Sequence, residues 1–459
     1  MMTMGNALAG GILTNTNQSV SFLKNPARDA AIGLDGVYSN PAGVAFLPEG
    51  FHLALNWQYA HQTRTITSTN EVFALGKKND GNATKIFEGT ADAPVIPSVQ
   101  GAYNKGNWSL QFNLSVPGGG GSCEFADGLG SFERVVGSIA NTLKPFGVQG
   151  YDMDGYMKGR QYYYGVQLGV AYKIYPNLSV YGGMRMLYGD ATYKAKISNI
   201  QVKTASGYVD FADFLQATTP AATAAGYGDA FKSLQTYADG VNLLCNQDGV
   251  GFAPVVGVDW KYRNFNFAAK YEFKTQIRMK NESTVNKAHA IAAVNKYRDG
   301  EKVNEDQPAL LTVGAQWAPI DVVRLNIGWH HFFDKNAEWY NNTQDLLEHD
   351  TNEFLAGADW DVNDKLTVSC GGQLTRYGLS DAYMNDISFV VNSYSIGFGF
   401  DYKVKDNITL SAAYFQTSYG HYDVDYAAQK MMGMLAMPAG NDSYTRTNRV
   451  LGIGCQLDF

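Results

Sequence analysis

Apolar and polar residues alternate with a period of two along most of the chain. Between Phe51 and Tyr59 the odd positions are all apolar, and His52, Asn56 and Gln58 lie between them. This alternation is typical of a strand with one apolar and one polar face. The same pattern predicts 14 strands, at residues 51–64, 95–104, 107–116, 158–174, 177–198, 250–262, 265–282, 305–318, 321–336, 350–361, 364–380, 389–404, 407–422 and 444–459.

The connections between these strands alternate strictly between short and long. Six are tight turns, such as Asn104–Asn107, and seven are longer, the longest at residues 117–157 and 199–249. An even number of antiparallel strands with short turns on one side and long loops on the other is typical of bacterial outer-membrane barrels. Such a barrel must close, because lipid offers no partner to an unpaired backbone amide.

Aromatic residues gather at the strand ends beside the tight turns, where an interfacial girdle belongs. The girdle is predicted to contain Tyr103, Trp108, Tyr172, Trp260, Tyr262, Trp317, Trp360 and Tyr402. The chain ends on Phe459, after an alternating last strand. This ending resembles the signal that the bacterial outer-membrane assembly machinery reads, and we expect that machinery as a partner.

The composition agrees with a barrel. Charged residues are 17% of the chain, against about 25% in ordinary soluble proteins. Gly is 49 of 459 residues, and Tyr and Phe number 29 and 24. No stretch of 18 apolar residues occurs, which excludes a helical membrane protein. A net charge of −7 argues against nucleic acid as a partner. Four Cys without C-x-x-C and seven His without H-E-x-x-H predict neither a metal site nor another cofactor.

The first residues resemble the end of an export signal. Ala7-Leu8-Ala9 before Gly10 has the form of a signal-peptidase site, but no charged or apolar region precedes it. We interpret residues 1–9 as the remnant of a signal peptide, with an ordinary flexible N-terminus as the alternative. The expected location is the bacterial outer membrane, with the short turns periplasmic and the long loops extracellular. We expect a monomer.

Residues 10–50 do not alternate, and two Asn-Pro-Ala triplets, Asn25–Ala27 and Asn40–Ala42, impose turns. A 14-stranded barrel is too wide for its own side chains to fill, so this segment is predicted to plug the lumen. The alternative is a periplasmic tail. The predicted fold is therefore an all-β membrane protein, a 14-stranded antiparallel transmembrane β-barrel at residues 51–459 with an N-terminal hatch at residues 10–50.

The hatch contains three short motifs, A-x-x-G-x-D at 30–35, S-N-P-A-G at 39–43 and L-P-x-G at 47–50. In this order and spacing they resemble the hatch of the FadL/TodX outer-membrane transporters for long-chain fatty acids and other hydrophobic compounds. The candidate hatch residues are Gly33, Asp35, Ser39, Asn40, Pro41, Ala42 and Gly43. The resemblance implies uptake by passive diffusion, most of all of fatty acids. It implies capture on the outer loops, a lumen pocket gated by the hatch, and lateral release through a gap at a kinked strand.

Both long loops contain apolar residues at helical spacing, which could form the capture surface. The candidate ligand contacts are Phe125, Leu129, Phe132, Ile139, Phe211, Phe214 and Phe231. The alternative is that the helices pack on each other and cap the barrel, and both can hold at once. A fatty-acid head group needs a cation. Arg134, Lys158, Arg160 and Lys232 lie in or beside the loops, and Arg160 is the candidate contact.

Two further features of this region carry predictions. Cys123 and Cys245 lie one in each long loop, and an extracellular setting permits a disulfide between them. Cys370 and Cys455 fall on separate strands, too far apart to pair. Pro117 and Gly118–Gly121 could disturb strand pairing and form the lateral gap, because Pro donates no ladder bond. The simpler account of this stretch is the start of a loop.

Two other functions stay open at this point. A general diffusion porin would share the barrel but have no reason to begin with a plug. A barrel enzyme of the lipase or protease type would need catalytic groups, yet the chain has no G-x-S-x-G. His330 and His331 are adjacent on one strand, so only one of them can face the lumen. We expect a channel and not an enzyme.

Overall fold

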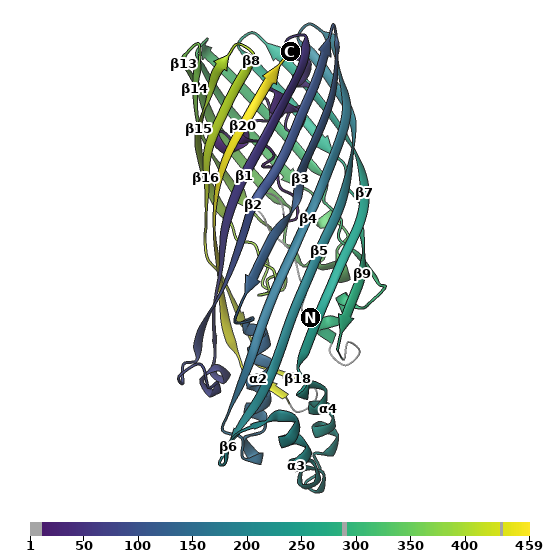
Figure 1. The fold of residues 1–459 in the computed structure, drawn as a ribbon, viewed down its shortest axis with the longest axis vertical. Helices are drawn as coiled ribbons and strands as arrows, with labels where there is room; N and C mark the ends of the chain where they lie inside the picture. Colours follow the sequence, from purple (N-terminus) through teal and green to yellow (C-terminus); the bar gives the residue numbers. More distant parts are fainter. Residues whose placement is uncertain (1–11, 287–291, 432–434) are drawn as a thin grey trace.

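A closed wall of antiparallel strands contains most of the chain (Figure 1). The computed structural model describes residues 12–286, 292–431 and 435–459, so the proposed signal remnant at residues 1–9 lies outside the described residues. Strand β1 pairs with β2 on one side and with β20 on the other, which closes the ring. The wall consists of β1 (Gly50–Asn70), β2 (Thr84–Lys105), β3 (Trp108–Phe125), β4 (Gly150–Tyr175), β5 (Leu178–Thr204), β7 (Val241–Tyr262), β8 (Phe265–Glu272) with β9 (Arg278–Val285), β10 (Lys302–Asn304) with β11 (Leu310–Ile320), β12 (Val323–Phe332), β13 (Thr351–Asn363), β14 (Leu366–Arg376), β15 (Ser393–Lys405), β16 (Ile408–Tyr419) with β17 (Tyr422–Tyr426), and β20 (Gly440–Asp458). The three joined pairs each form one wall strand, and the predicted 14-stranded antiparallel barrel is confirmed.

The remaining elements lie within the ring or at the end of the barrel with the long loops. They are α1 (Val20–Lys24), α2 (Gly130–Thr142), α3 (Phe211–Ala224), α4 (Gly228–Ala238), the 3-10 helices η1 (Leu34–Val37), η2 (Gly43–Phe46), η3 (Glu71–Leu75), η4 (Lys144–Phe146), η5 (Ala292–Tyr297), η6 (Asp334–Asn336) and η7 (Tyr340–Leu346), and the short strands β6 (Gly207–Asp210), β18 (Gln429–Met431) and β19 (Leu435–Met437). Figure 1 shows α2, α3 and α4 at the opposite end of the barrel from the C-terminus. No helix in the described part of the chain is both long and apolar enough to span a membrane.

The outer face of the wall has an apolar belt at the end with the tight turns. The eight predicted girdle residues are all between 37% and 57% exposed, so their rings point away from the lumen. On β1 the outward residues from Phe51 to Tyr59 are apolar or aromatic, and from His61 to Thr69 they are polar. The predicted girdle is therefore confirmed, and the apolar belt covers only part of the height of the wall.

Several wall strands are longer than the alternation predicted. Strand β3 continues to Phe125 and β4 begins at Gly150, so the loop predicted at 117–157 is confined to 126–149. The loop predicted at 199–249 is likewise shortened to 205–240, because β5 ends at Thr204 and β7 begins at Val241. The outward residues of the extensions are mostly polar, while inward residues such as Tyr193, Leu243 and Cys245 are buried and apolar. The alternation therefore continues with its apolar face turned inward, and only the outward apolar pattern that marks the belt ends.

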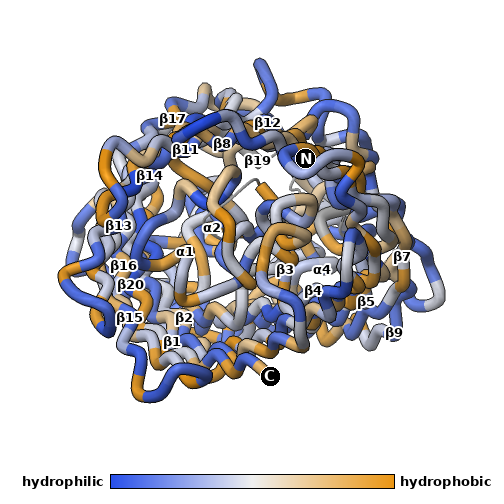
Figure 2. Tube along the Cα trace, turned by 90° about the horizontal axis from the view of Figure 1, so that it is seen from above, coloured by the Kyte–Doolittle hydropathy of each residue, from blue (hydrophilic) through white to orange (hydrophobic). Residues whose placement is uncertain are grey.

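Residues 12–49 occupy the lumen at the level of the belt. Seen along the barrel in Figure 2, α1 lies inside the ring, and Val20, Phe22 and Leu23 pack against inward residues of the wall. Leu34, Val37 and Val44 pack against Ala54 of β1 and Ala102 of β2. Small inward residues on the wall leave the room that this segment occupies.

Candidate functional site

The hatch motif folds on itself through one buried ion pair. Arg28 donates from Nε and Nη2 to the two oxygens of Asp35, over 2.8 and 3.0 Å. Ser39 donates to the backbone oxygen of Asp35 over 3.2 Å. A fork of two parallel bonds fixes both position and orientation. The motif aspartate therefore sets the path of the chain between the two Asn-Pro-Ala triplets.

The second part of the motif attaches the hatch to the wall. Asn40 donates from Nδ2 to Asp259 of β7 over 2.6 Å and accepts a bond from the Gly43 amide over 3.2 Å. The backbone oxygen of Pro41 accepts from Gln111 over 2.8 Å, and that of Ala42 accepts a 2.6 Å bond. A Cβ at Gly43 would lie 2.8 Å from the Asp259 carboxylate. Only Gly leaves room for this approach.

Charged groups join the hatch to the opposite side of the wall. His330 of β12 lies between Asp29 of the hatch and Glu353 of β13, with both carboxylate oxygens 2.9 Å from its ring nitrogens. Lys24 pairs with Asp401 of β15. The prediction that only one of the adjacent histidines faces the lumen is confirmed, because His330 is buried and His331 bonds to Asn352 on the outer face.

The wall is interrupted between β2 and β3. The two strands pair at Ala91 and Cys123 and again from Val99 and Leu114, with no pairing between. The β2 segment between these points contains Pro94 and Pro97, which donate no backbone bond. On the other side, β3 has two register shifts against β4, one from Ser115 to Gly118 and one from Gly118 to Gly121. The sequence had named this stretch as a gap but favoured a loop start, and that preference is wrong because the strand continues beyond it.

The hatch bridges this interruption. Leu13, Thr14 and Asn15 run antiparallel beside β3, and the Asn15 amide bonds to the Pro117 oxygen over 2.9 Å. A Cβ at Gly118 would lie 2.8 Å from the Leu13 oxygen, so a larger residue would separate the two segments. The hatch segment therefore supplies backbone partners that β2 does not.

One hatch side chain completes the bridge. The Gln18 amide accepts from the Val116 N–H over 3.1 Å and donates to the Val116 oxygen over 3.2 Å, as a strand partner would. Ser98 of β2 donates to the Gln18 backbone oxygen over 2.6 Å. Gln18 thus connects the two edges of the interruption, which we call the β2–β3 gap.

A small recess lies in the β2–β3 gap. Its apolar lining comes from Ala60, Ala91, Ala93, Ile96, Val116 and Tyr162, and its polar lining from Asn15, Gln62, Asp92, Gly121 and Ser122. The volume is about 20 Å³, enough for about one water molecule. The gap is therefore closed to any larger solute in this conformation, and the hatch is part of what closes it.

Two arginines face each other beside the gap, and the sequence analysis did not name them. Arg64 of β1 is directly opposite Arg446 of β20, and they are only 6% and 2% exposed. Arg446 donates to Gln62, which lines the recess, over 2.9 Å. Like charges directly opposite on paired strands repel each other. The alternation on β1 and β20 predicts that both side chains point into the lumen, so the sequence contains a signal for them.

The predicted apolar contacts come together at the loop end of the barrel. Phe125, Leu129, Phe132, Ile139, Phe211, Phe214 and Phe231 belong to one cluster, and none is more than 9% exposed. Phe125 ends β3, Leu129 precedes α2, and the other five residues lie on α2, α3 and α4. Helices α3 and α4 pack on each other, and all seven residues are buried in this conformation, so ligand contact and capping both stay predictions.

The predicted cations do not join that cluster as a head-group site. Arg160 points outward from β4 and pairs with Asp190 over 2.7 Å, and Lys158 pairs with Glu124 over 2.7 Å. Arg134 bonds to both oxygens of Asp442 over 2.7 and 2.8 Å. Lys232 of α4 is exposed. Strand parity explains the outward direction of Arg160, which lies near the start of the strand predicted at residues 158–174.

The predicted disulfide is wrong. Cys123 and Cys245 are both free and buried, on β3 and β7. Strands β4 and β5 lie between them, which corresponds to about 14 Å across the sheet, and a disulfide needs about 4.4–6.8 Å between Cα atoms. Cys370 and Cys455 are also free. The error follows from the strand extensions, because both cysteines were placed on flexible loops.

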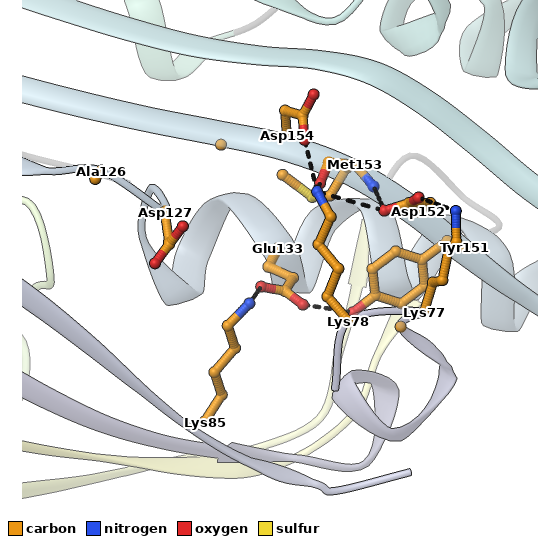
Figure 3. Close-up of a pocket in the computed structure, with 12 residues that line it drawn as sticks. Lys77, Lys78, Lys85, Ala126, Asp127, Glu133, Tyr151, Asp152, Met153 and Asp154 are labelled. Atoms are coloured by element: carbon orange, nitrogen blue, oxygen red, sulfur yellow. Dashed lines mark hydrogen bonds and ion pairs between the residues drawn. The ribbon is translucent and has the colours of Figure 1, made fainter. Parts of the chain in front are cut away.

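A polar pocket of about 210 Å³ lies at the loop end, between η3, α2 and β4 (Figure 3). Lys78 reaches Asp154 over 2.6 Å, and Lys85 reaches Glu133 over 2.7 Å. Tyr151 donates to the same glutamate over 3.1 Å. The charges satisfy one another and clamp the η3 loop onto α2 and β4. Among the described residues, no group of three or more His, Cys, Asp or Glu is arranged to hold a metal ion.

Solved structures share this fold over the full length of the chain. A FadL homologue from Pseudomonas aeruginosa aligns with a TM-score of 0.66 at 12% identity, covering 100% of both chains. The P. putida toluene transporter TodX aligns at 0.55 with 14% identity over 93% of this chain and 94% of its own. The Ralstonia pickettii toluene transporter TbuX aligns at 0.55 with 14% identity over 96% and 97%. No family model and no curated protein matches the sequence. The resemblance to the FadL/TodX family that the hatch motifs indicated is thus confirmed at the level of the fold.

Proposed function

We propose that this barrel takes up hydrophobic small molecules across the bacterial outer membrane by passive diffusion. The apolar helices at the loop end capture the molecule, the hatch controls its passage through the lumen, and the β2–β3 gap releases it sideways. The short turns then lie in the periplasm and the long loops outside. The apolar belt with its aromatic girdle supports the membrane location. Structural neighbours named as toluene transporters and as a FadL homologue support the substrate class.

The observation that carries this proposal is the β2–β3 gap and its closure by the hatch. A hydrophobic solute gains nothing by leaving the lumen into water, whereas lipid outside the wall is a favourable destination. Where strands pair, opening the wall costs several kcal/mol for each polar group left unsatisfied in lipid. At the gap, the bonds that Gln18, Thr14 and Asn15 make can be exchanged by movement of the hatch alone.

Arg64 and Arg446 favour a long-chain fatty acid over a neutral hydrocarbon. A carboxylate between the two guanidinium groups would relieve their repulsion through charge-assisted bonds, and a hydrocarbon could not. The pair lies next to Gln62 of the recess, so a head group held there leaves the tail close to the gap. The arginine pair therefore supports a long-chain fatty acid as the proposed substrate, beside the toluene named for two of the structural neighbours.

The rival functions have less support. A general diffusion porin needs an open lumen, and residues 12–49 fill the lumen at the level of the belt. For a barrel enzyme, the inward histidine would have to act on a substrate, yet Asp29 and Glu353 occupy both nitrogens of His330. We further propose a monomer whose exposed Phe459 serves the assembly machinery, with a hydrophobic ligand and membrane lipid as its other partners.

The test of lateral release uses a disulfide at the upper edge of the gap. Ala91 lies directly opposite the native Cys123, and both side chains are buried on the inward face. Opposed residues of antiparallel strands have Cα atoms about 4.5–5.5 Å apart, within the range of a disulfide. We expect Ala91→Cys to lower uptake of a radiolabelled long-chain fatty acid at least tenfold when oxidised, with recovery after reduction.

A matched disulfide controls for stiffening of the barrel. Met157→Cys with Ala195→Cys joins β4 to β5 at another directly opposed, buried pair, and should leave uptake unchanged. Ala91→Ser controls for the substitution itself. If the oxidised Ala91→Cys protein transports as fast as the reduced one, lateral release at this gap is refuted.

A second measurement tests the choice of substrate. Arg446→Gln should reduce fatty-acid uptake by about tenfold or more, because one charge-assisted bond is worth roughly 1.5–3 kcal/mol. Uptake of toluene through the same variant should stay within twofold of the unchanged protein. Equal loss of both substrates would mean that the arginine supports the wall and does not recognise a head group.

A further inference from the structure

A second cluster of cations lies on the outer face of the wall, away from the lumen and the gap chemistry. Lys158 and Arg160 of β4 and Lys194 and Lys196 of β5 all point outward. Lys158 is directly opposite Lys194, and Arg160 is directly opposite Thr192. This outer basic patch stands out because the chain as a whole has a net charge of −7.

The patch keeps a surplus of positive charge after its own ion pairs are counted. Glu124 lies 2.7 Å from Lys158, and Asp190 lies 2.7 Å from Arg160. Asp154 is held by Lys78 over 2.6 Å, and Asp248 of β7, directly opposite Asp190, is itself directly opposite Lys280 of β9. Among the described residues, the four cations of the patch therefore have two carboxylates in ion pairs, which leaves two positive charges. Opposed Lys158 and Lys194 also repel each other, since their Cβ atoms are about 5 Å apart.

The height of the patch on the wall is informative. Tyr162 and Tyr164 stack at 5.9 Å on the outer face of β4 and mark the upper edge of the apolar belt. A strand tilted by about 40° climbs about 5 Å for every two residues. Arg160 therefore lies about 5 Å beyond the ring of Tyr162, and Lys158 with Lys194 about 10 Å beyond it. This is the level of lipid head groups when the belt lies in the membrane.

Farther down the same two strands, about 20 Å below Arg160, the outer surface is apolar. Leu168 and Met184 are directly opposite each other on the same two strands, and both are exposed. A molecule held at the patch by an anionic group can therefore lay hydrocarbon chains along the wall beneath it. Inorganic phosphate would use only the cations, and a lipid would use both surfaces.

We propose that the outer basic patch binds the phosphate groups of a phosphorylated glycolipid in the outer leaflet. Arg160 offers a planar fork to phosphate oxygens, and the lysines act as point charges beside it. The bound phosphate separates Lys158 from Lys194 and neutralises the surplus charge. Because Ser122, opposite Arg160, lines the recess, the glycolipid sits next to the outer mouth of the β2–β3 gap.

The inference rests on the proposed membrane location and is independent of transport. The experiment is native mass spectrometry of the full chain in detergent, titrated with bis-phosphorylated lipid A and separately with the same lipid after removal of its phosphates. The unchanged protein should bind the phosphorylated form at least tenfold more tightly. Lys194→Ser with Lys196→Ser should weaken that binding by roughly 30-fold, on the basis of about fivefold per lysine.

The control removes the same charge elsewhere. Lys203 and Lys232 are exposed at the loop end, away from the girdle, and their double replacement by Ser should leave lipid binding unchanged. Heat-dependent mobility on gels checks that each variant is a folded barrel. Equal affinity for dephosphorylated lipid, or no loss in the Lys194/Lys196 variant, would overturn the proposal. Displacement of the lipid by millimolar inorganic phosphate would overturn the assignment to a lipid. Hydrocarbon uptake by the same variants reports separately on the proposed transport.

Discussion

Two seams of the same wall are built in opposite ways. Strands β4 and β5 pair almost without interruption from Gly150 and Lys203 to Tyr175 and Leu178. Strands β2 and β3 pair only at their ends and leave residues 92–98 of β2 without a partner on β3. The first seam contains no proline, whereas the second contains Pro94, Pro97 and Pro117. Because the prolines lack the backbone N–H that would pair with the neighbouring strand, the second seam depends on the hatch for closure.

The comparison also shows what replaces the missing pairing. At the β4–β5 seam each strand satisfies the other. At the β2–β3 gap, Gln18 and the segment Leu13–Asn15 satisfy β3 from inside the lumen. A seam closed by a neighbouring strand opens only when the barrel unfolds. A seam closed by a lumen segment opens when that segment moves, which is the property a lateral exit requires.

The largest expected effect comes from removing the segment that closes the gap. Deletion of residues 10–48 should convert a barrel with no ion conductance into one with clear single-channel steps in a planar bilayer. The reason is that the hatch, among the described residues, packs against the inward side chains of the wall at the level of the belt. Full conductance by the intact chain would instead indicate a porin, and silence after deletion would mean that the wall collapses without its plug.

A smaller effect is expected from the single side chain that joins the two edges. Gln18→Ala leaves the buried N–H and C=O of Val116 without the partners that the amide supplied. Each such group costs about 1–3 kcal/mol, so local opening of the gap should become easier by about 2–4 kcal/mol. Hydrogen exchange of the Val116 amide measures this directly.

The matched control lies on a complete seam. Ser395→Ala on β15 removes a 2.9 Å bond to Thr417 of β16 but leaves their backbone pairing intact. Amide exchange of its neighbours should therefore change little. If exchange rises as much as it does for Gln18→Ala, the hatch has no special role at the gap.

The continuously paired β4–β5 seam should be destabilised by an added side-chain atom and not by the loss of one hydrogen bond. Gly169 and Gly183 are directly opposite on β4 and β5, and the Tyr181 ring lies over both. Gly169→Ala would place a methyl group against that ring and displace it. We expect a loss of about 1–3 kcal/mol in stability. The unfolding temperature from gel mobility should fall, with uptake unchanged below that temperature; an unchanged temperature would show that the ring moves aside freely.

The smallest effect is local and depends on pH. At the outer end of the β12–β13 seam, the Thr351 amide donates to Asp334 over 3.2 Å. Burial raises the pKa of Asp334 to about 7, from 3.8. Because burial disfavours the charged carboxylate, the neutral carboxyl of Asp334 stabilises the folded state, and this contribution is complete below pH 3.8 and is lost as the pH rises through about 7.

Exchange protection of the Thr351 amide, corrected for intrinsic rates, should therefore decline between pH 5 and pH 8. Asp334→Asn should flatten the dependence, since the amide has no proton to lose in this range. The β4–β5 seam serves as the internal reference, and a parallel decline there would show a general effect of pH on the barrel.

The sequence was most informative where one face of a strand is apolar. The belt strands, their number, and the girdle from Tyr103 to Tyr402 followed from alternation alone, because lipid and lumen impose different side chains on successive positions. The hatch motif was also visible in the sequence. In the structure Asp35 bonds to Arg28 and Asn40 bonds to Gly43, and both partners lie within seven residues along the chain.

Alternation was misleading where the outer face leaves the apolar belt. There β3, β4, β5 and β7 continue with polar residues on the outside, and the sequence analysis described these parts as loops. The misplaced disulfide follows from that error, because Cys123 and Cys245 were both assigned to the loops. If the alternation of inward and outward positions had been continued beyond the belt, it would have predicted that the side chains of Cys123, Arg64 and Arg446 point inward.

The sequence by itself determined an outward apolar surface, a closed ring of 14 strands, a lumen segment, and the prolines and glycines that weaken one seam. These are properties of single strands or short motifs, where the residue type at each position depends on whether that position faces lipid, lumen or a turn. Only the tertiary structure decided which groups meet across the lumen: Gln18 with Val116, Asp29 with His330, and Arg64 with Arg446. Such pairs are set by how the ring closes and where the hatch lies within it, and no spacing along the chain records either.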